Sequence, residues 1–293
     1  MPRPSTSDFR LGLIGYPLSH SLSPQIHTTA LQSCGLQGDY SLFPVHPDDK
    51  QGLKELLARV RSGEIHGLNV TIPHKQNVIE DLDELTATAK AIGAVNIIYL
   101  REDKLIGDNT DVRGFSADLK KFLTTETRRH GERCVLVLGA GGSARAVIYA
   151  LLNDGYQVTV AARRIEQAHQ LAAPLTDYQL SITDFSLAMI ELSNISLIVN
   201  TTPLGMMPNI DQSPWPENLS FPPYAAIYDL VYNPRETKIV RDACSQGRPA
   251  ATGLGMLIEQ AALSFEIWTG QNPSREIMRA SIAQSTAPNH GTL

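Results

Sequence analysis

Short apolar runs alternate with amphipathic segments along the whole chain of 293 residues. This alternation favours an α/β fold over an all-β fold or a helical bundle, because buried strands give short apolar runs and helices give a 3.6-residue period. In the first third, the runs predict strands at residues 11–14, 40–45, 67–72 and 95–100. Helical periodicity between them is found at residues 24–34, 50–61 and 74–82.

A second α/β series follows a polar connection at residues 124–133. Its expected strands are residues 135–138, 158–161, 195–199 and 226–229, with helices between the early pairs. Six prolines between residues 203 and 223 indicate irregular backbone, because proline lacks the N–H that helices and central strands use. Segment 253–283 is expected to be helical, and only the last residues of the chain have a composition typical of disorder.

The length of the chain indicates two domains. Hydrophobic residues make up 42% of the chain and charged residues 19%, which is enough apolar material for two ordinary cores. The net charge of −5 gives no general attraction to nucleic acids or to anionic membranes. The three cysteines lie far apart and have no metal-ligand spacing. With no signal peptide or membrane span in the sequence, we expect a cytoplasmic protein without a metal, a nucleic-acid partner or a membrane partner.

A glycine-rich turn lies near the middle of the chain, between the expected strand 135–138 and a helix. Its spacing, Gly139-x-Gly141-x-x-Ala144, is that of a dinucleotide-binding turn, in which small residues let the backbone approach a pyrophosphate at a helix N-terminus. Such a turn can also be only a tight strand-to-helix loop. The next strand follows at the distance expected of a βαβ unit, which favours cofactor binding. The candidate residues of the turn are Gly139, Ala140, Gly141, Gly142, Ser143 and Ala144.

Two arginines at the end of that next strand favour NADP over NAD. NAD-selective sites usually carry Asp or Glu there, where a carboxylate accepts hydrogen bonds from the ribose hydroxyls. This chain has Arg163 and Arg164 after Ala162 instead. Guanidinium groups form charge-assisted hydrogen bonds with a phosphate, so the pair suits a 2′-phosphate. The alternative is an exposed basic pair at the start of a helix.

Four stretches before the glycine turn carry polar side chains that a fold alone does not require. They are SHSLSP at residues 19–24, NVTIPHK at 69–75, GAVN at 93–96 and GDNTD at 107–111. In SHSLSP, Ser23 before Pro24 is typical of a helix start with serine as the cap. That leaves the Ser21 hydroxyl without a structural explanation.

The other stretches place further polar groups at the ends of expected strands. In NVTIPHK, Asn69 and Thr71 lie on one face of a strand, and Lys75 lies in the first turn of the next helix. A cation there opposes the helix dipole, so a structural role for Lys75 is poorly supported. GAVN ends at Asn96 within an expected strand, and GDNTD ends at Asp111.

Taken in order along the chain, these motifs resemble those of the shikimate dehydrogenases. The family pattern SxS, NVTxPxK, GAVN, DNTD, GAGG, YDxxY and GxGMLxxQ is matched at residues 21–23, 69–75, 93–96, 108–111, 139–145, 228–232 and 253–260. The resemblance covers residues from about 11 to about 270. It is specific, since seven ordered motifs rarely coincide. The departures are Ala162 where Asn often stands, Arg164 where Thr is common, and Leu230 where Met is frequent.

The resemblance implies an α/β fold with two domains and a cleft between them. Residues 1–111 would form an N-terminal α/β substrate domain completed by C-terminal helices at 253–293, and residues 112–252 an inserted Rossmann-like NADP-binding domain. The implied reaction is the reversible, NADPH-linked reduction of 3-dehydroshikimate to shikimate, a step of aromatic amino-acid biosynthesis through chorismate. A monomer or a homodimer is expected.

The resemblance also implies roles for individual residues. Those resembling carboxylate-binding hydroxyls are Ser21, Ser23 and Tyr232. Those resembling groups that read the ring hydroxyls are Thr71, Asn96, Asp111 and Gln260, and Asn69 is a further expected substrate contact. Lys75 and Asp111 resemble the catalytic pair, in which an ammonium group stabilises the developing oxyanion and supplies its proton. Besides the glycine turn and the two arginines, the expected cofactor contacts are Thr202, Leu230 and Gly253.

Three alternatives to this function stay open. A dehydrogenase of broader specificity would also act on quinate and could use NAD, although the two arginines argue against NAD. A non-catalytic ligand-sensing regulator on the same fold would lack Lys75 or Asp111, and both are present. A folate-linked dehydrogenase of similar architecture would not explain the SxS and GxGMLxxQ stretches.

Overall fold

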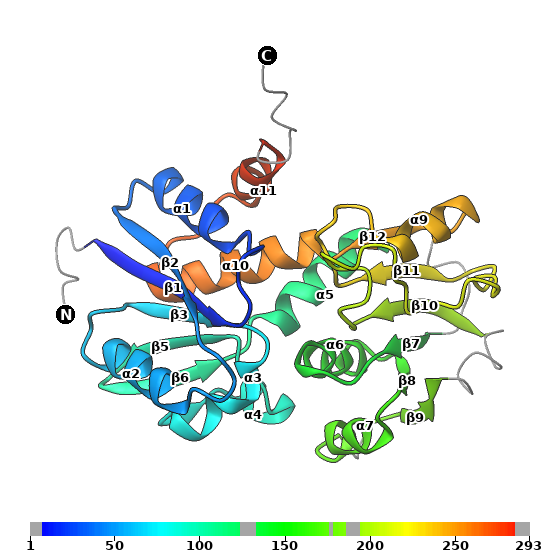
Figure 1. Ribbon diagram of the computed structural model, residues 1–293, viewed down its shortest axis with the longest axis horizontal. Helices are drawn as coiled ribbons and strands as arrows, with labels where there is room; N and C mark the ends of the chain where they lie inside the picture. The colour runs from blue at the N-terminus through cyan, green and yellow to red at the C-terminus, as the bar shows by residue number, and fades with distance from the viewer. Residues whose placement is uncertain (1–7, 124–132, 176–177, 186–193, 285–293) are drawn as a thin grey trace. The chain divides into compact units, whose positions relative to one another are not determined.

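The computed structural model describes residues 8–123, 133–175, 178–185 and 194–284. The chain divides into two compact units (Figure 1). We call residues 1–110 together with 258–293 the N-terminal unit, and residues 111–257 the inserted unit. The expected divisions after residues 111 and 252 lie one and five residues from these boundaries. The expected connection at 124–133 (apart from its last residue) and the C-terminal tail lie outside the described residues.

The N-terminal unit is built on a six-stranded mixed sheet with the order β2-β1-β3-β5-β6-β4. The strands are β1 (Phe9–Gly15), β2 (Gly38–Pro44), β3 (Gly67–Val70), β4 (Glu84–Leu85), β5 (Ile97–Arg101) and β6 (Lys104–Asp108). Strand β1 is parallel to β2 and β3, whereas β5 is antiparallel to β3 and β6. The four strands expected from the sequence are confirmed, and Asn96 directly precedes β5 rather than lying within it.

Strands β4 and β6 are additional to the expected ones, for two physical reasons. Strand β4 is two residues long, which is too short for an alternating pattern to be visible. Strands β5 and β6 form a hairpin whose two loop residues, Glu102 and Asp103, both have positive φ. Such turns normally use Asn-Gly or Asp-Gly, so Glu-Asp gives no hairpin signal in the sequence.

The helices of the N-terminal unit are α1 (Ser23–Ser33), α2 (Lys50–Arg61), α3 (His74–Asn77), α4 (Ala87–Ile92), α10 (Leu254–Thr269) and α11 (Arg275–Gln284). The expected helix at 74–82 is a single turn, α3, followed by a 3-10 turn at Ile79–Asp81. The expected helix at 253–283 is two helices, because Gly270 adopts φ +70° and Pro273 follows before α11 begins. Helix α10 begins in the inserted unit and continues in the N-terminal one.

The two faces of this sheet carry separate apolar clusters. On one face, Leu68 and Val70 of β3 pack in a cluster with apolar residues of α2. On the other, Tyr40 of β2 packs with Trp268 of α10. Because successive side chains of a strand point to opposite faces, Asn69 points to the α10 face.

The inserted unit contains a six-stranded parallel sheet with the order β12-β11-β10-β7-β8-β9. Its strands are β7 (Cys134–Leu138), β8 (Gln157–Ala162), β9 (Leu180–Asp184), β10 (Ile195–Asn200), β11 (Ala226–Asp229) and β12 (Ala250–Thr252). Its helices are α5 (Asp111–Phe122), α6 (Gly142–Asn153), α7 (Ile165–Ala172) and α9 (Lys238–Ser245). From β9 the strands are the third, second, first, fourth, fifth and sixth of the unit, which is the Rossmann order. The expected α/β fold with a Rossmann-like domain is confirmed.

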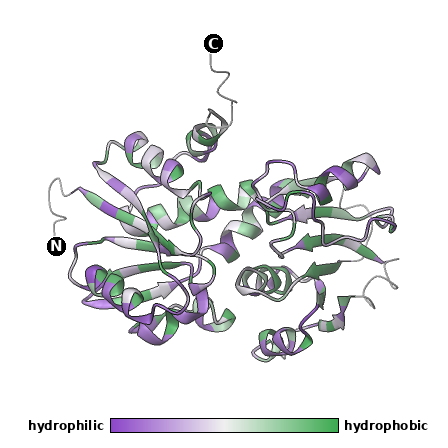
Figure 2. Cartoon of the chain, in the orientation of Figure 1, coloured by the Kyte–Doolittle hydropathy of each residue, from purple (hydrophilic) through white to green (hydrophobic). Residues whose placement is uncertain are grey.

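The central strands of this sheet are apolar along most of their length (Figure 2). Val135, Leu136, Val137 and Leu138 of β7 are almost fully buried. Strands covered on both faces give such continuous runs, and this is why they are visible in the sequence. The edge strands β9 and β12 are additional to the expected ones, since most of their residues are only half-buried.

Two further observations concern the chain as a whole. Residues 201–225, which are all described, form turns and loops without a helix or strand, as the six prolines predict. Within the described ranges, no helix has the length and apolar character needed to cross a membrane.

Candidate active site

Helix α1 carries the two serines of SHSLSP at its N-terminal end. The helix begins at Ser23, one residue earlier than expected, and the cap residue Leu22 makes no side-chain hydrogen bond. The Ser21 hydroxyl accepts a hydrogen bond from the backbone N–H of Ser23 at 3.3 Å. The expectation that Ser23 caps the helix is therefore wrong, because Ser23 is the first residue of the helix and the helix has no side-chain cap. The Ser23 side chain is buried.

The segment after β3 brings the backbone of Lys75 to Val95, the residue before Asn96. The backbone N–H of Thr71 bonds to the carbonyl of Ile14 at 2.8 Å, which continues the sheet beyond the strand. Lys75 lies in α3, and its carbonyl accepts from the N–H of Val95 at 2.7 Å. Lys75 is only 8% exposed, which is unusual for a lysine.

Asn96 and Gln260 are brought into direct contact although they are far apart in the sequence. Asn96 Nδ2 donates to Gln260 Oε1 at 3.3 Å. Asn96 is 2% exposed and Gln260, on α10, is half-buried. Two amides that the sequence predicts to read ring hydroxyls therefore lie side by side.

Helix α1 also buries a histidine that the sequence did not single out as functional. The ring of His27 stacks on that of Tyr40, with centroids 4.4 Å apart and planes 2° apart. Burial lowers the pKa of His27 to about 3, against a weak opposing effect of Asn69. The imidazole is therefore neutral across the physiological range.

In the inserted unit, the turn between β7 and α6 has the geometry of an anion cradle. Gly139 adopts φ +106°, and a side chain there would meet Thr201 Oγ1 at 2.8 Å and Thr202 Cγ2 at 2.9 Å. A Cβ on Gly141 would meet nothing within 4 Å, so the backbone is open on that side. Helix α6 starts at Gly142 without a side-chain cap or an acidic residue in its first turn. Its first N–H groups suit a pyrophosphate, and these residues fit a bound dinucleotide.

The loops after β10 and β11 are held by a buried carboxylate, Asp229. Its Oδ1 accepts from Asn200 Nδ2 at 2.8 Å and from the N–H of Val231 at 3.0 Å, and its Oδ2 accepts from Thr237 Oγ1 at 2.6 Å. Burial raises the pKa of Asp229 to about 6, although the three hydrogen bonds oppose this shift. Asp229 ends β11, as expected, but its role in holding the loops was not visible in YDLVY.

Asn200 links this carboxylate to the expected cofactor residue Thr202. Its Oδ1 accepts from the backbone N–H of Thr202 at 2.9 Å and from Thr202 Oγ1 at 2.7 Å. Its backbone carbonyl accepts from the N–H of Leu230 at 2.9 Å. Gly253 lies against the same loop, since a Cβ there would be 2.3 Å from the carbonyl of Leu230. Thr202, Leu230 and Gly253 are thus gathered around one end of the sheet, beside the glycine turn.

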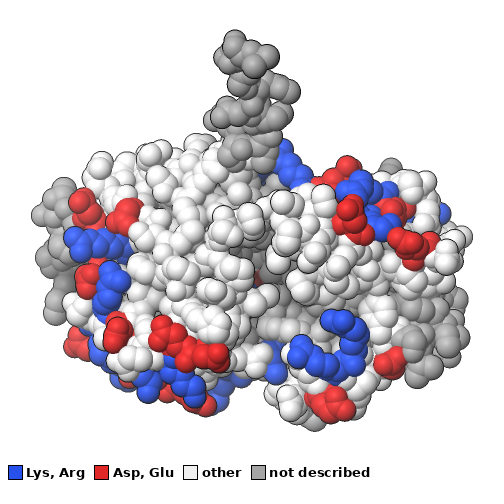
Figure 3. Space-filling view, in the orientation of Figure 1, with Lys and Arg blue, Asp and Glu red and all other residues white. Residues whose placement is uncertain are grey.

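The two arginines after β8 are exposed, and Arg164 is the cap residue of α7. Lys and Arg side chains gather on the surface near α7 (Figure 3). Exposed guanidinium groups at the end of the second strand of a Rossmann sheet are accessible to a cofactor phosphate.

Two more of the expected site residues belong to the inserted unit. Asp111 is the first residue of α5 and is 5% exposed. A carboxylate there also stabilises the helix through its dipole. Tyr232 follows β11 and is half-buried, and burial raises the pKa of its hydroxyl.

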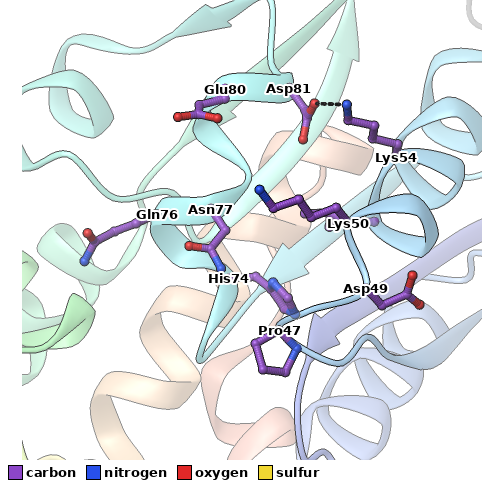
Figure 4. Close-up of a pocket in the computed structure, with 10 residues that line it drawn as sticks. Pro47, Asp49, Lys50, Lys54, His74, Gln76, Asn77, Glu80 and Asp81 are labelled. Atoms are coloured by element: carbon purple, nitrogen blue, oxygen red, sulfur yellow. Dashed lines mark ion pairs between the residues drawn. The ribbon is translucent and has the colours of Figure 1, made fainter.

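A separate pocket of the N-terminal unit lies beside α2 and α3 (Figure 4). It is lined by Pro47, Asp49, Lys50, Leu53, Lys54, His74, Gln76, Asn77, Glu80 and Asp81. Lys54 pairs with Asp81 at 3.9 Å. The lining mixes two lysines with three carboxylates, and it contains none of the site residues expected from the sequence.

Family models match three parts of the chain. They describe a shikimate dehydrogenase substrate-binding domain at residues 13–98, a shikimate/quinate 5-dehydrogenase at residues 122–206, and a shikimate 5′-dehydrogenase C-terminal domain at residues 253–282.

Full-length relatives and solved structures are similar over almost the whole chain. The NADP⁺ shikimate dehydrogenase of Salinibacter ruber is 41% identical over 280 residues, which are 92% of this chain and 94% of that protein. The corresponding Bacillus subtilis enzyme is 37% identical, over 92% of this chain and 95% of its own. The crystal structure of shikimate 5-dehydrogenase from Thermus thermophilus with NADP(H) and shikimate aligns with a TM-score of 0.83 and 35% identity, covering 94% of this chain and 99% of that one.

Proposed function

This chain belongs to the shikimate dehydrogenase family, and we propose that it catalyses the reversible, NADP(H)-linked interconversion of 3-dehydroshikimate and shikimate in the biosynthesis of aromatic amino acids. The observation that carries the proposal is a buried lysine, Lys75, whose backbone is bonded to Val95 directly before Asn96 of the amide pair Asn96 and Gln260. A buried ammonium beside neutral donors and acceptors suits a hydroxylated ring in which one oxygen changes charge during the reaction.

The substrate is held by neutral groups at its carboxylate and by amides at its ring. Ser21, Ser23 and Tyr232 donate to the carboxylate. Thr71, Asn96 and Gln260 bind the ring hydroxyls, together with Asp111. Hydroxyl donors pair with an anion without placing a fixed positive charge in the site. The ammonium of Lys75 then interacts with the reacting oxygen and not with the carboxylate.

Lys75 acts on the oxygen of the ring ketone. Bound NADPH would supply the hydride for the ketone carbon, and negative charge would then develop on the oxygen. The Lys75 ammonium stabilises that charge and donates a proton from Nζ to the oxygen. Asp111 orients Lys75 and a neighbouring ring hydroxyl. In the oxidation of shikimate, neutral Lys75 accepts the proton of the alcohol.

NADP is held by the inserted unit. The residues of the β7–α6 turn would bind its pyrophosphate, and Thr202, Leu230 and Gly253 would line the site, which the open backbone at Gly141 and the hydrogen-bonded Thr202 support. Arg163 and Arg164 bind the 2′-phosphate, which selects NADP over NAD.

The proposal is tested by following NADPH absorbance in the purified protein. We expect 3-dehydroshikimate to consume NADPH, shikimate to reduce NADP⁺ in the reverse direction, and quinate to be a much poorer substrate. No turnover of either shikimate-series substrate by the folded protein would contradict the proposal, and equal turnover of quinate would show a broader specificity.

A further inference from the structure

A buried chain of hydrogen bonds in the N-terminal unit starts at Tyr40 on β2. Tyr40 Oη donates to Asn69 Oδ1 at 2.9 Å, and Asn69 Nδ2 donates to Ser264 Oγ on α10 at 3.0 Å. These residues are 6%, 5% and 0% exposed, respectively. The contacts join residues 29 and 195 positions apart in the sequence.

From Ser264 the chain continues to the two amides of the proposed substrate site. Ser264 Oγ lies 3.2 Å from Thr110 Oγ1, and Thr110 Oγ1 accepts a hydrogen bond from Asn96 Nδ2 at 2.9 Å. Asn96 Nδ2 also donates to Gln260 Oε1 at 3.3 Å. The hydroxyls and amides from Tyr40 to Gln260 are therefore joined by side-chain hydrogen bonds without a gap.

Two backbone groups fix the orientation of the amides in this chain. Asn69 Nδ2 also donates to the carbonyl of Asn96 at 3.2 Å, and a carbonyl can only accept. The N–H of Thr110 donates to Asn96 Oδ1 at 2.7 Å, and an N–H can only donate. Turning either amide over would bring two acceptors or two donors together, which is costly in a buried place.

The same contacts use both N–H groups of the Asn69 amide inside the protein. We propose that Tyr40, Asn69, Thr110 and Ser264 are positioning residues that orient the amides of Asn96 and Gln260 toward a hydroxylated ligand without touching it. For Asn69, this replaces the direct substrate contact expected from the sequence. The inference rests on the proposed function, because the ligand whose binding it explains is shikimate.

The test removes single hydroxyls from the chain and measures steady-state kinetics. Ser264→Ala takes the acceptor from Asn69 and the donor from Thr110, and Tyr40→Phe removes only the first donor. We expect the KM for shikimate to rise roughly fivefold to tenfold in Ser264→Ala and less in Tyr40→Phe, as lost neutral hydrogen bonds predict. The KM for NADP⁺ should not change, and kcat should change less than the KM for shikimate.

The matched control is Thr269→Val. Thr269 lies on the same helix, is 4% exposed, and donates to the carbonyl of Phe265 outside the chain. The Thr269→Val protein also loses a buried hydroxyl, so its thermal stability should fall about as much as that of Ser264→Ala. Its KM for shikimate should stay at the wild-type value. An equal rise of KM in this control would show a general structural effect and overturn the inference.

A double-mutant cycle separates positioning from an independent contact. If Ser264 acts through Asn96, the double variant Ser264→Ala/Asn96→Ala should have nearly the same KM for shikimate as Asn96→Ala alone. If the two residues act independently, the two increases in KM should multiply. Multiplying effects, or folded Ser264→Ala and Tyr40→Phe proteins with a wild-type KM, would overturn the inference. Failure of the proposed function would look different, since the wild-type protein itself would then neither bind nor oxidise shikimate.

Discussion

In the N-terminal unit, the groups behind the proposed substrate residues are hydroxyls and amides, and His27, a buried titratable group, stacks on Tyr40 beside them. In the inserted unit, the loops of the proposed cofactor site are held by a carboxylate, Asp229, which accepts three hydrogen bonds. The two arrangements differ in how the free energy of unfolding depends on pH.

The difference follows from the pKa shifts of the two groups. His27 titrates at about 3 in the folded protein instead of 6.5, so the unfolded chain binds the proton first as the pH falls. Asp229 titrates at about 6 instead of 3.8, so the folded chain binds the proton first. Acid therefore destabilises the N-terminal unit through His27, and it stabilises the inserted unit through Asp229. The same cause, burial of a titratable group, acts with opposite sign on an acid and a base.

The largest expected effect concerns the chemistry that we assign to the N-terminal unit. Lys75→Ala should lower kcat by about two to four orders of magnitude, because it removes the proton donor of the reaction. Binding of NADP⁺, measured by calorimetry, should not change, since the cofactor residues lie in the other unit. Lys54→Ala, which removes an exposed lysine of the same unit, serves as the control. A folded Lys75→Ala protein with near-normal turnover would exclude the assignment.

The next effect concerns the cofactor choice that we assign to the inserted unit. Arg163→Ala should lower the preference for NADPH over NADH by roughly a hundredfold, the value of one or two charge-assisted hydrogen bonds. The kinetics with NADH should stay nearly the same, and rising salt should weaken NADPH binding more than NADH binding. The matched variant is Arg241→Ala, which removes another exposed arginine of this unit. The ratio of kcat/KM for the two cofactors decides the point, and an unchanged ratio would mean that Arg163 is only a solvated residue at a helix start.

A third prediction isolates the acid sensitivity of the N-terminal unit. As the pH falls from 6.5 to 4.5, the wild-type unit should lose about 2 kcal/mol of unfolding free energy relative to His27→Phe, because the unfolded histidine takes up a proton that the folded one does not. Phenylalanine can stack on Tyr40 but does not titrate. Hydrogen exchange of the α1 and β3 amides measures this unit separately, and amides of β10 and β11 provide the internal control. Parallel pH profiles of the two proteins would contradict a buried neutral His27.

The smallest expected effect has the opposite sign and belongs to the inserted unit. As the pH falls from 6.5 to 4.5, the free energy of unfolding of the wild-type unit should rise by about 2 kcal/mol relative to Asp229→Asn, because the folded carboxyl takes up a proton below pH 6. Hydrogen exchange of the β10 and β11 amides measures this change. Asparagine lowers stability at every pH by disturbing the three hydrogen bonds, so the informative quantity is the slope with pH. Asp211→Asn, at an exposed position, should keep the wild-type slope. A wild-type slope in Asp229→Asn would show that another group titrates.

Local signals in the sequence were sufficient for most of the secondary structure. Apolar runs located the buried strands of both sheets, and the Gly139 turn was visible because its φ of +106° and the closeness of Thr201 and Thr202 require glycine. Short edge strands such as β4 were missed, since two residues carry no period. Ser23 was wrongly predicted to be the helix cap, because the cap depends on where α1 begins, and the helix begins at Ser23 itself.

The sequence by itself determined the fold class, the candidate catalytic lysine and the order of the motifs, because these depend on spacing within short segments. Only the tertiary structure decided which polar side chains from distant segments contact one another. Asn69 meets Tyr40 and Ser264, and Asn200 meets Asp229, across 29, 195 and 29 residues of chain. No local pattern encodes such partners, since they meet only when strands and helices pack. The pKa values of His27 and Asp229 depend on the same packing, because burial is a property of the folded surroundings and not of the residue.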